Sequence, residues 1–432
     1  MHEFRYVGAR LQCEGVSVEA LARKHGTPLF VYSQGTVKGN YERLETALQG
    51  LDHRICYAMK ANSNRAILRT FADLGAGFDI VSGGELQRAM AAGADPATCV
   101  FAGVGKTEDE IRLALKSGIY CFNVESEAEL QRLDRVAGRM RKKAPVAVRV
   151  NPDVDAHTHA KITTGTYENK FGIPFEKVGE LYAWAAKRKH LRLRGVQMHI
   201  GSQLTEVDPF EQAVRKVAPL ARELADRHGI EFLSIGGGMG IVYRPALASG
   251  PATWWLSKEG RKVLNPTAYA GTLMPLLQPL GLKILLEPGR YLVGNAGILV
   301  TRVEYAKQSG HKTFLIVDSA MNDLLRPALY DAYHEIIAVE RRARRTVVAD
   351  VVGPVCESGD TFCRDRPLPL MEEGELLAVL SAGAYGSVMS GNYNSRPLAA
   401  EVLVHGKRAA VVRERQPVEA IWAGEKTASW QR

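Results

Sequence analysis

From about residue 54 to residue 288, short apolar runs alternate with longer amphipathic stretches. Stretches such as GGELQRAMAAG and EDEIRLALKSG carry apolar positions three and four residues apart and end in glycine, which predicts helices. Eight apolar, β-branched runs between them predict strands, at His53–Met59, Gly77–Val81, Cys99–Gly103, Tyr120–Val124, Pro145–Val150, Leu193–His199, Phe232–Ile235 and Lys283–Leu286. Eight strands alternating with helices predict a (β/α)8 barrel. An open doubly wound sheet would more often carry GxGxxG after its first strand, where this chain has none.

After about residue 290 the pattern changes, and strand-like runs dominate. They predict an all-β C-terminal domain, with strands at Thr313–Val317, Arg345–Val352, Glu375–Leu380 and Glu401–Val412, the last holding a hairpin at VHGKRA. The first 35 residues include one more strand, TPLFVYS, which fits either part of the chain. We assign residues 1–35 to the β domain, residues 36–288 to the barrel and residues 289–432 to the C-terminal β-barrel or sandwich.

Composition narrows the class of protein. The 432 residues are 46% hydrophobic and 24% charged, which is ordinary for a globular protein of two domains. The six cysteines form no CxxC pair, so they indicate neither a zinc site nor a disulfide framework and suit a reducing cytoplasm. No basic-then-apolar leader and no apolar run of membrane-spanning length is present. The formal charge of +9 is scattered without interleaved aromatics, which favours a small anionic ligand over nucleic acid.

Candidate chemistry lies at the predicted carboxyl ends of the strands, where barrel enzymes place their active sites. Lys60 follows the first strand, and a partly desolvated lysine there can form a Schiff base. His199 ends the sixth strand, and it is either a core histidine or a ring that lies against a cofactor. The triple glycine at 236–238 follows the seventh strand, where barrels often bind phosphate, and Glu287 follows the eighth.

A lysine, a stacking group, a phosphate cradle and a carboxylate are the four features that pyridoxal phosphate requires. The carboxylate would keep the ring nitrogen protonated and the ring a strong electron sink. A metal site is the weaker reading, because only the segment from Asp155 to His159 hints at one, and its HxH pattern lacks the ligand count. We therefore predict pyridoxal 5'-phosphate as the cofactor and no metal.

Nine motifs in order along nearly the whole chain resemble those of the diaminopimelate decarboxylases, a family of fold-type III pyridoxal-phosphate decarboxylases. They are YAMKAN, GFDIVSGGEL, RVNPDVDAHTHAKITTG with ENKFGI, MHIGSQ, GGGMG, EPGR, MNDLLRPALY, CESGD and AGAYG. The resemblance implies decarboxylation of meso-diaminopimelate at its D centre to L-lysine and CO2, the last step of lysine biosynthesis.

The resemblance also assigns roles to individual residues. Lys60 carries the cofactor, His199 stacks on its ring and Glu287 binds its nitrogen. Cys356 donates a proton, and with Glu357 it reaches the active site of the other subunit of a homodimer. The cofactor-binding set is Lys60, Asp79, His199, Ser202, Gly236, Gly237, Gly238, Glu287, Pro288, Gly289, Arg290 and Tyr385, and the substrate-binding set is Arg290, Arg326, Tyr330, Glu357 and Tyr385.

Other readings stay open at this point. A decarboxylase of the same fold that acts on ornithine, lysine, arginine or carboxynorspermidine is the main alternative. A racemase would need a tyrosine base in the β domain, and no matching motif is found there. A non-catalytic carrier usually lacks a β domain, and a regulatory relative usually loses the lysine or the proton donor, whereas this chain has both Lys60 and Cys356. Two features depart from the family pattern: the segment after Asn394 lacks a second basic–proline pair, and the stretch Tyr243–Asn265 has no assigned role.

Overall fold

The computed structural model describes residues 1–154 and 170–431. The chain forms two compact units. The first, here called the barrel unit, comprises Val37–Ile241 and Trp255–Leu292. The second, the sheet unit, comprises Met1–Thr36, Val242–Trp254 and Val293–Arg432. Residues 242–254 therefore group with the sheet unit, whereas the sequence predicts them in the barrel. Tyr243 of this segment, for example, lies against Arg326.

Eight parallel strands close the barrel, as predicted, because β8 pairs with both β7 and β9 and completes the ring. In chain order they are β5 (His53–Ala58), β6 (Gly77–Ile80), β7 (Cys99–Phe101), β8 (Cys121–Val124), β9 (Ala144–Asn151), β11 (Leu191–Gln197), β12 (Phe232–Ser234) and β13 (Lys283–Leu286). A further two-residue strand, β10 (Ile173–Pro174), pairs with β9 outside the ring. A buried apolar cluster inside the barrel is built from Cys56, Val100, Cys121, Ala147, Phe232 and Leu285.

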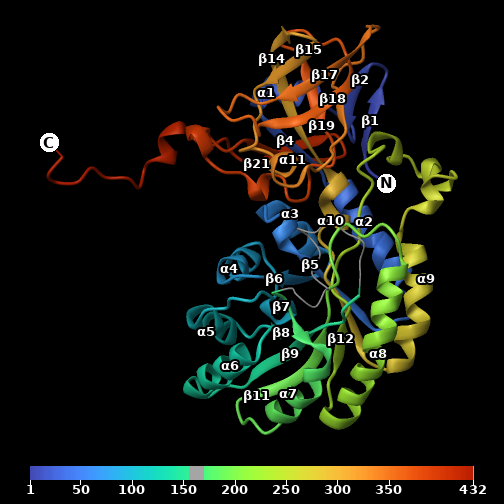
Figure 1. Cartoon of the computed structure of the whole chain (residues 1–432), viewed down its shortest axis with the longest axis vertical. Coiled ribbons are helices and arrows are strands. Elements are labelled where there is room, and N and C mark those ends of the chain that lie inside the picture. Colours follow the sequence, from blue (N-terminus) through green and yellow to red (C-terminus); the bar gives the residue numbers. More distant parts are fainter. Residues whose placement is uncertain (155–169, 432) are drawn as a thin grey trace. The chain divides into compact units, whose positions relative to one another are not determined.

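Helices surround these strands (Figure 1). They are α2 (Gln34–Ala47), α3 (Arg65–Asp73), α4 (Gly83–Ala91), α5 (Glu108–Ser117), α6 (Glu127–Arg139), α7 (Val178–Ala185), α8 (Asp208–His228) and α9 (Pro266–Leu277). Local sequence explains their ends. In α5, Thr107 and Glu110 form a capping box at the start, and Gly118 ends the helix at φ 72°, a conformation that favours glycine. Among the described residues, no helix is long and apolar enough to cross a membrane.

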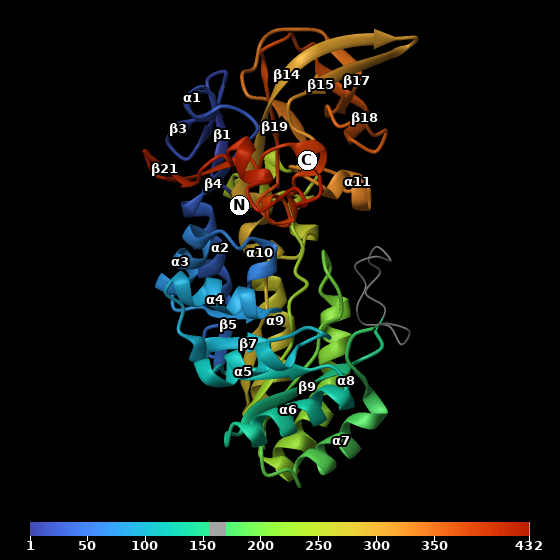
Figure 2. The same ribbon diagram turned by 90° about the vertical axis from the view of Figure 1, so that its left-hand side faces the viewer.

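The sheet unit contains a mixed sheet of β18 (Thr361–Pro369), β17 (Thr346–Val352), β15 (Lys312–Val317), β14 (Gly297–Ser309), β4 (Leu29–Ser33), β20 (Ala400–His405) and β21 (Arg408–Arg413), in that spatial order. The strand β19 (Leu376–Val379) also pairs with β14 and carries β16 (Ile336–Ala338). Figure 2 shows β14 as a long strand that forms a hairpin with β15. The predicted hairpin at VHGKRA is confirmed as β20 and β21.

The N-terminal segment contributes to this unit. A small sheet of β1 (Phe4–Val7), β2 (Arg10–Cys13) and β3 (Val16–Ser17) precedes α1 (Val18–His25). The strand β4, which is the TPLFVYS run of the sequence, lies between β14 and β20 and is fully buried. Alternating residues of β4, β14 and β20 pack with α1 into one apolar core.

Candidate active site

The carboxyl ends of the barrel strands bring a lysine and a carboxylate together. Lys60 lies in a single 3-10 turn, Met59–Ala61, directly after β5, and Asp79 is the third residue of the neighbouring β6. The Lys60 Nζ donates to Asp79 Oδ2 at 3.0 Å. The Asp79 side chain is 1% exposed, whereas that of Lys60 is 42% exposed. The lysine is therefore anchored by a buried anion while its amine stays accessible at the barrel mouth.

Glu287 follows β13 and is buried at the centre of three donors. Ser234 Oγ donates to Oε1 at 2.7 Å, Gln197 Nε2 to Oε2 at 3.0 Å and Asn123 Nδ2 to Oε1 at 3.2 Å. Burial and the negative charge of Asp79 together raise the pKa of Glu287 to about 7, although the hydrogen bonds and the charge of Lys60 oppose the rise. A carboxyl group held in this way can keep or share a proton near neutral pH.

His199 lies two residues beyond β11 with a defined tautomer. The backbone N–H of Gly237 donates to its Nδ1 at 3.2 Å, so the proton of the neutral ring is on Nε2. Packing around the ring lowers the pKa of His199 well below its usual range, and the positive charges of Arg149 and Lys60 act in the same direction. The ring is therefore neutral at physiological pH, which suits stacking against a flat aromatic group.

The glycine run 236–238 follows β12 and leaves no room for side chains. A Cβ on Gly236, Gly237 or Gly238 would collide with the carbonyl oxygens of Met198, Glu287 and Gly201, respectively. Gly236 and Gly238 also have φ values of 70° and 110°, which glycine adopts readily. Bare backbone at the mouth of a parallel barrel, after the seventh strand, is the arrangement that binds phosphate.

The turn after Glu287 completes this end of the barrel. Pro288 accepts a hydrogen bond at its carbonyl from the N–H of Ala58 at 3.0 Å. Gly289 packs against Ala58, because a Cβ on it would lie 3.1 Å from the Ala58 oxygen. Arg290, which begins α10 (Arg290–Val293), is buried and donates to Ser202 Oγ at 3.0 Å. The structure thus gathers eleven predicted residues of the barrel unit at one end, Lys60, Asp79, His199, Ser202, Gly236, Gly237, Gly238, Glu287, Pro288, Gly289 and Arg290.

Five predicted residues belong to the sheet unit. Cys356 is exposed, and its N–H donates to Asn394 Oδ1 at 3.3 Å. Glu357, also exposed, accepts from the Tyr393 hydroxyl at 3.0 Å. Both side chains therefore stand on the surface of their own unit. The remaining three are Arg326, Tyr330 and Tyr385.

Arg326 begins α11 (Arg326–Tyr330) and is buried, whereas Tyr330 is half-buried at the end of that helix. The Arg326 NH1 lies 2.9 Å from His334 Nε2, and its guanidinium lies 4.9 Å from the ring centre of Tyr243. Tyr243, for which the sequence suggested no role, is therefore a packing partner of Arg326. Tyr385 is half-buried in a turn and has a φ of 55°.

Sequence reasoning missed the three donors to Glu287. Asn123, Gln197 and Ser234 are polar residues at or next to the last position of β8, β11 and β12. A buried amide or hydroxyl at the end of a parallel strand is the signal that would have found them, because such positions face the barrel mouth.

Within residues 1–154 and 170–431, no three His, Cys, Asp or Glu side chains gather in a way that would hold a metal ion. The segment from Asp155 to His159, the one hint of a metal in the sequence, lies outside the described residues.

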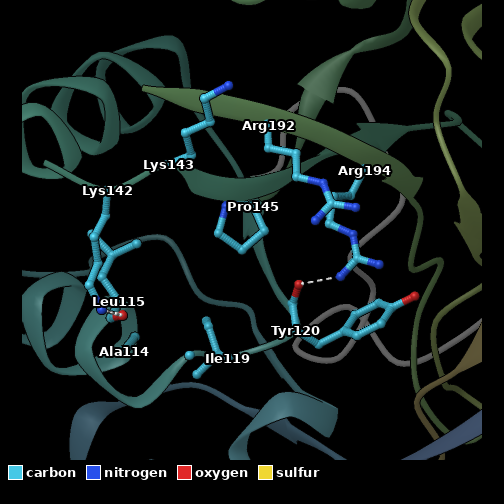
Figure 3. A pocket seen from close by; sticks show the side chains of 10 residues that line it. Ala114, Leu115, Ile119, Tyr120, Lys142, Lys143, Pro145, Arg192 and Arg194 are labelled. Atoms are coloured by element: carbon cyan, nitrogen blue, oxygen red, sulfur yellow. Dashed lines mark hydrogen bonds between the residues drawn. The ribbon is translucent and has the colours of Figure 1, made fainter. Parts of the chain in front are cut away.

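A hollow of about 430 Å³ lies at the other end of the barrel from these residues. Its lining comes from the end of α5 and from the beginnings of β8, β9 and β11, and Figure 3 shows Tyr120, Pro145, Arg192 and Arg194 around it. None of the predicted site residues lines it.

Comparison with known proteins places this fold and site in a class. Residues 34–294 match the pyridoxal-binding domain of the pyridoxal-dependent decarboxylases. A curated diaminopimelate decarboxylase of Pseudomonas aeruginosa is 49% identical, over 98% of this chain and 99% of that protein. The crystal structure of the Helicobacter pylori diaminopimelate decarboxylase with L-lysine is 41% identical, with a TM-score of 0.87 over 94% of this chain and 98% of that chain. The M. jannaschii enzyme, also solved with L-lysine, is 35% identical, with a TM-score of 0.89 over 98% of each chain.

A barrel with a lysine, a buried carboxylate and a glycine run at its mouth fits a pyridoxal-dependent decarboxylase, and the match over residues 34–294 shows that class. The degree and extent of the similarity then specify the family more closely. The chain belongs to the diaminopimelate decarboxylase family.

Proposed function

We propose that this chain decarboxylates meso-diaminopimelate at its D centre and releases L-lysine and CO2, with pyridoxal phosphate as cofactor. The observation that carries the proposal is the grouping of the buried Glu287, Lys60 and the glycine run at one end of the barrel. The named relatives and the two lysine-bound structures support the same substrate.

The residues of the barrel unit fit pyridoxal phosphate. The amine of Lys60 is accessible and lies beside a buried carboxylate. The second oxygen of that carboxylate, Asp79 Oδ1, is buried and accepts no hydrogen bond from the described residues. The glycine run offers backbone at distances that any side chain would block. Lys60 would hold the cofactor covalently, Gly236–Gly238 and Ser202 would bind its phosphate, and Glu287 would bind its ring nitrogen.

When bound, the cofactor supplies an electron sink for the pair that remains when CO2 leaves. Glu287 would hold a proton at the ring nitrogen, and the raised pKa of its carboxyl group, about 7, favours a shared proton near neutral pH. His199, neutral with its proton on Nε2, would cover one face of the ring without adding charge. Asp79 keeps the Lys60 amine in place at the barrel mouth.

Residues of the sheet unit serve the substrate in this proposal. Arg326 binds the distal carboxylate of the substrate, because a planar guanidinium pairs well with a carboxylate. Tyr330 and Tyr385 also contact the substrate. Glu357 receives the distal ammonium. Cys356 delivers a proton to the carbon that has lost CO2. Ornithine, lysine and arginine lack the distal carboxylate that Arg326 would bind, which makes them the poorer substrates.

We propose further that the active chain is a homodimer, in which Cys356 and Glu357 of one subunit complete the site of the other. Their exposure on the sheet unit supports this assignment. Six free thiols in the structure support a reducing, cytoplasmic location.

Mixed dimers test the shared site. Lys60→Ala and Cys356→Ala chains, each inactive alone, should recover about a quarter of wild-type activity after random exchange, since half of the dimers then carry one intact site. A matched control mixes Lys60→Ala with Glu287→Gln; both changes damage the barrel unit, so no dimer gains an intact site. No recovery in the first mixture after confirmed exchange would refute the shared site.

A further inference from the structure

Four buried charged side chains form a cluster next to the catalytic end of the barrel. They are Lys106, Glu125, Glu129 and Arg149, and none is more than 7% exposed. Lys106 lies in the loop between β7 and α5, Glu125 follows β8, Glu129 is in the first turn of α6 and Arg149 is on β9. Two cations and two anions leave the cluster electrically balanced.

The Lys106 ammonium ties three elements together. Its Nζ donates to the carbonyl of Gly103 at 2.7 Å, to the carbonyl of Asn123 at 2.8 Å and to Glu129 Oε1 at 2.7 Å. Three donors is the full capacity of an ammonium group, so every proton is used. The other oxygen of Glu129 accepts from the N–H of Glu125 at 3.0 Å. One side chain therefore fixes the loop after β7, the end of β8 and the start of α6.

Two short paths lead from this ammonium to the active site. Asn123, whose carbonyl Lys106 holds, donates its side-chain Nδ2 to Glu287 Oε1 at 3.2 Å. Glu125, whose N–H is held through Glu129, accepts from Arg149 NH1 at 3.0 Å. The positive charge of Arg149 in turn helps to keep His199 neutral.

We propose that Lys106 is a positioning residue for the decarboxylation, which sets the places of Asn123 and Arg149 and through them the surroundings of Glu287 and His199. The inference rests on the proposed roles of Glu287 and His199 at the cofactor. Packing alone does not require this lysine, because a buried ion pair is costly to desolvate and an apolar pair of the same volume often serves stability as well. The ion pair of Lys106 with Glu129 instead fixes the positions of the groups that are hydrogen-bonded to it, the carbonyls of Gly103 and Asn123 and the N–H of Glu125.

The test is Lys106→Met, a change that keeps the length of the side chain and removes the ammonium. In the holoenzyme we expect kcat to fall about tenfold or more, because small displacements at a reacting centre are costly in rate. KM should stay within about twofold, since Lys106 acts through other residues rather than on the substrate. The pH midpoint of the visible absorbance of the bound cofactor should move to higher pH, because losing a positive charge favours protonated forms nearby.

Arg194→Met is the matched control, because Lys106 and Arg194 contact opposite ends of the strand β8. Arg194 NH1 donates to the carbonyl of Tyr120, just before β8, at 3.0 Å (Figure 3). Its guanidinium also pairs with Glu231. Each substitution thus removes one cation that holds one carbonyl at an end of β8. The control should lower the melting temperature while kcat and the absorbance midpoint stay at their wild-type values.

A second variant keeps the test decisive if Lys106→Met does not fold. Glu129→Gln retains the size of the side chain and weakens the same chain of hydrogen bonds, so it should lower kcat in the same direction by a smaller factor. Wild-type kcat and absorbance midpoint in whichever variant folds, or an equal loss of kcat in Arg194→Met, would overturn the positioning role. A wild-type chain that binds no cofactor or releases no CO2 would instead refute the proposed function.

Discussion

The raised pKa of Glu287 makes the stability of the cofactor-free protein depend on pH. Some carboxyl groups have a higher pKa in the folded chain than in the unfolded chain. Such a group contributes its whole stabilisation at a pH below its unfolded pKa, and the contribution is lost as the pH rises through its folded pKa. For Glu287 the window runs from 4.5 to about 7. The difference of about 2.5, at about 1.4 kcal/mol per pH unit, amounts to about 3 kcal/mol.

Glu287→Gln removes this titration and keeps the size of the side chain. An amide in this position meets the donors of Asn123 and Gln197 less well, which costs a constant amount at every pH. The change with pH therefore reports the titration of Glu287 together with its coupling to Asp79. Relative to wild type, the apoprotein of Glu287→Gln should be least stable near pH 4.5 and gain about 3 kcal/mol by pH 8.

The assay is denaturant unfolding of both apoproteins at several pH values between 4.5 and 8, followed by a signal from the barrel unit. Glu231→Gln serves as the control, since arginines lower the pKa of that partly exposed carboxyl rather than raise it. Parallel stability profiles for wild type and Glu287→Gln across this range would refute the reasoning, because they would mean that Glu287 ionises normally in the folded chain.

Three further outcomes follow from the geometry. Gly237→Ala should weaken cofactor binding at least about tenfold in titrations of the apoprotein, because its Cβ would meet the Glu287 carbonyl, and wild-type affinity would contradict the cradle. Asp79→Asn should lower the pKa of Glu287, seen as a narrower window in the same unfolding series, because it removes the negative charge that opposes ionisation; an unchanged window would be inconsistent with that cause. Cys356→Ser should leave the cofactor spectrum intact and lower kcat about a hundredfold in steady-state assays, and a kcat near wild type would exclude it as the proton donor.

The barrel was predictable because its signals are local. Each strand is a short apolar run bounded by helical periodicity, and residues such as Lys60 and Glu287 follow such runs directly. The carboxyl ends of parallel strands meet at one face of the barrel, so residues that directly follow the strands in the sequence lie close together there. The glycine run was visible for the same reason, since its position after the seventh strand, where barrels often bind phosphate, distinguishes it from an ordinary tight loop.

The sheet unit was less predictable because its pairing joins distant segments. The long strand β14 begins in a turn after α10 and ends in exposed residues, so its sequence lacks a clear alternation of buried and exposed positions. Residues 242–254 group with this unit through contacts such as that of Tyr243 with Arg326. Nothing in the sequence around either residue indicates that the two are in contact.

Lys106 shows where sequence reasoning fails at the site. A lysine in a glycine-containing loop ordinarily lies in solvent, and nothing in the neighbouring residues indicates burial. Its ammonium is buried because Glu129, 23 residues later, returns on α6 to meet it. The pairing arises from the packing of α6 against the strands, which a single sequence does not reveal.

The substrate is the most direct test of the account. The purified holoenzyme should be offered meso-diaminopimelate, its L,L isomer, ornithine, arginine and lysine, with CO2 and amine product measured together. We predict equal amounts of CO2 and L-lysine from the meso isomer alone. Release of CO2 from ornithine, arginine or lysine, with none from the meso isomer, would contradict the assignment of Arg326 and Glu357 to a distal amino-acid group.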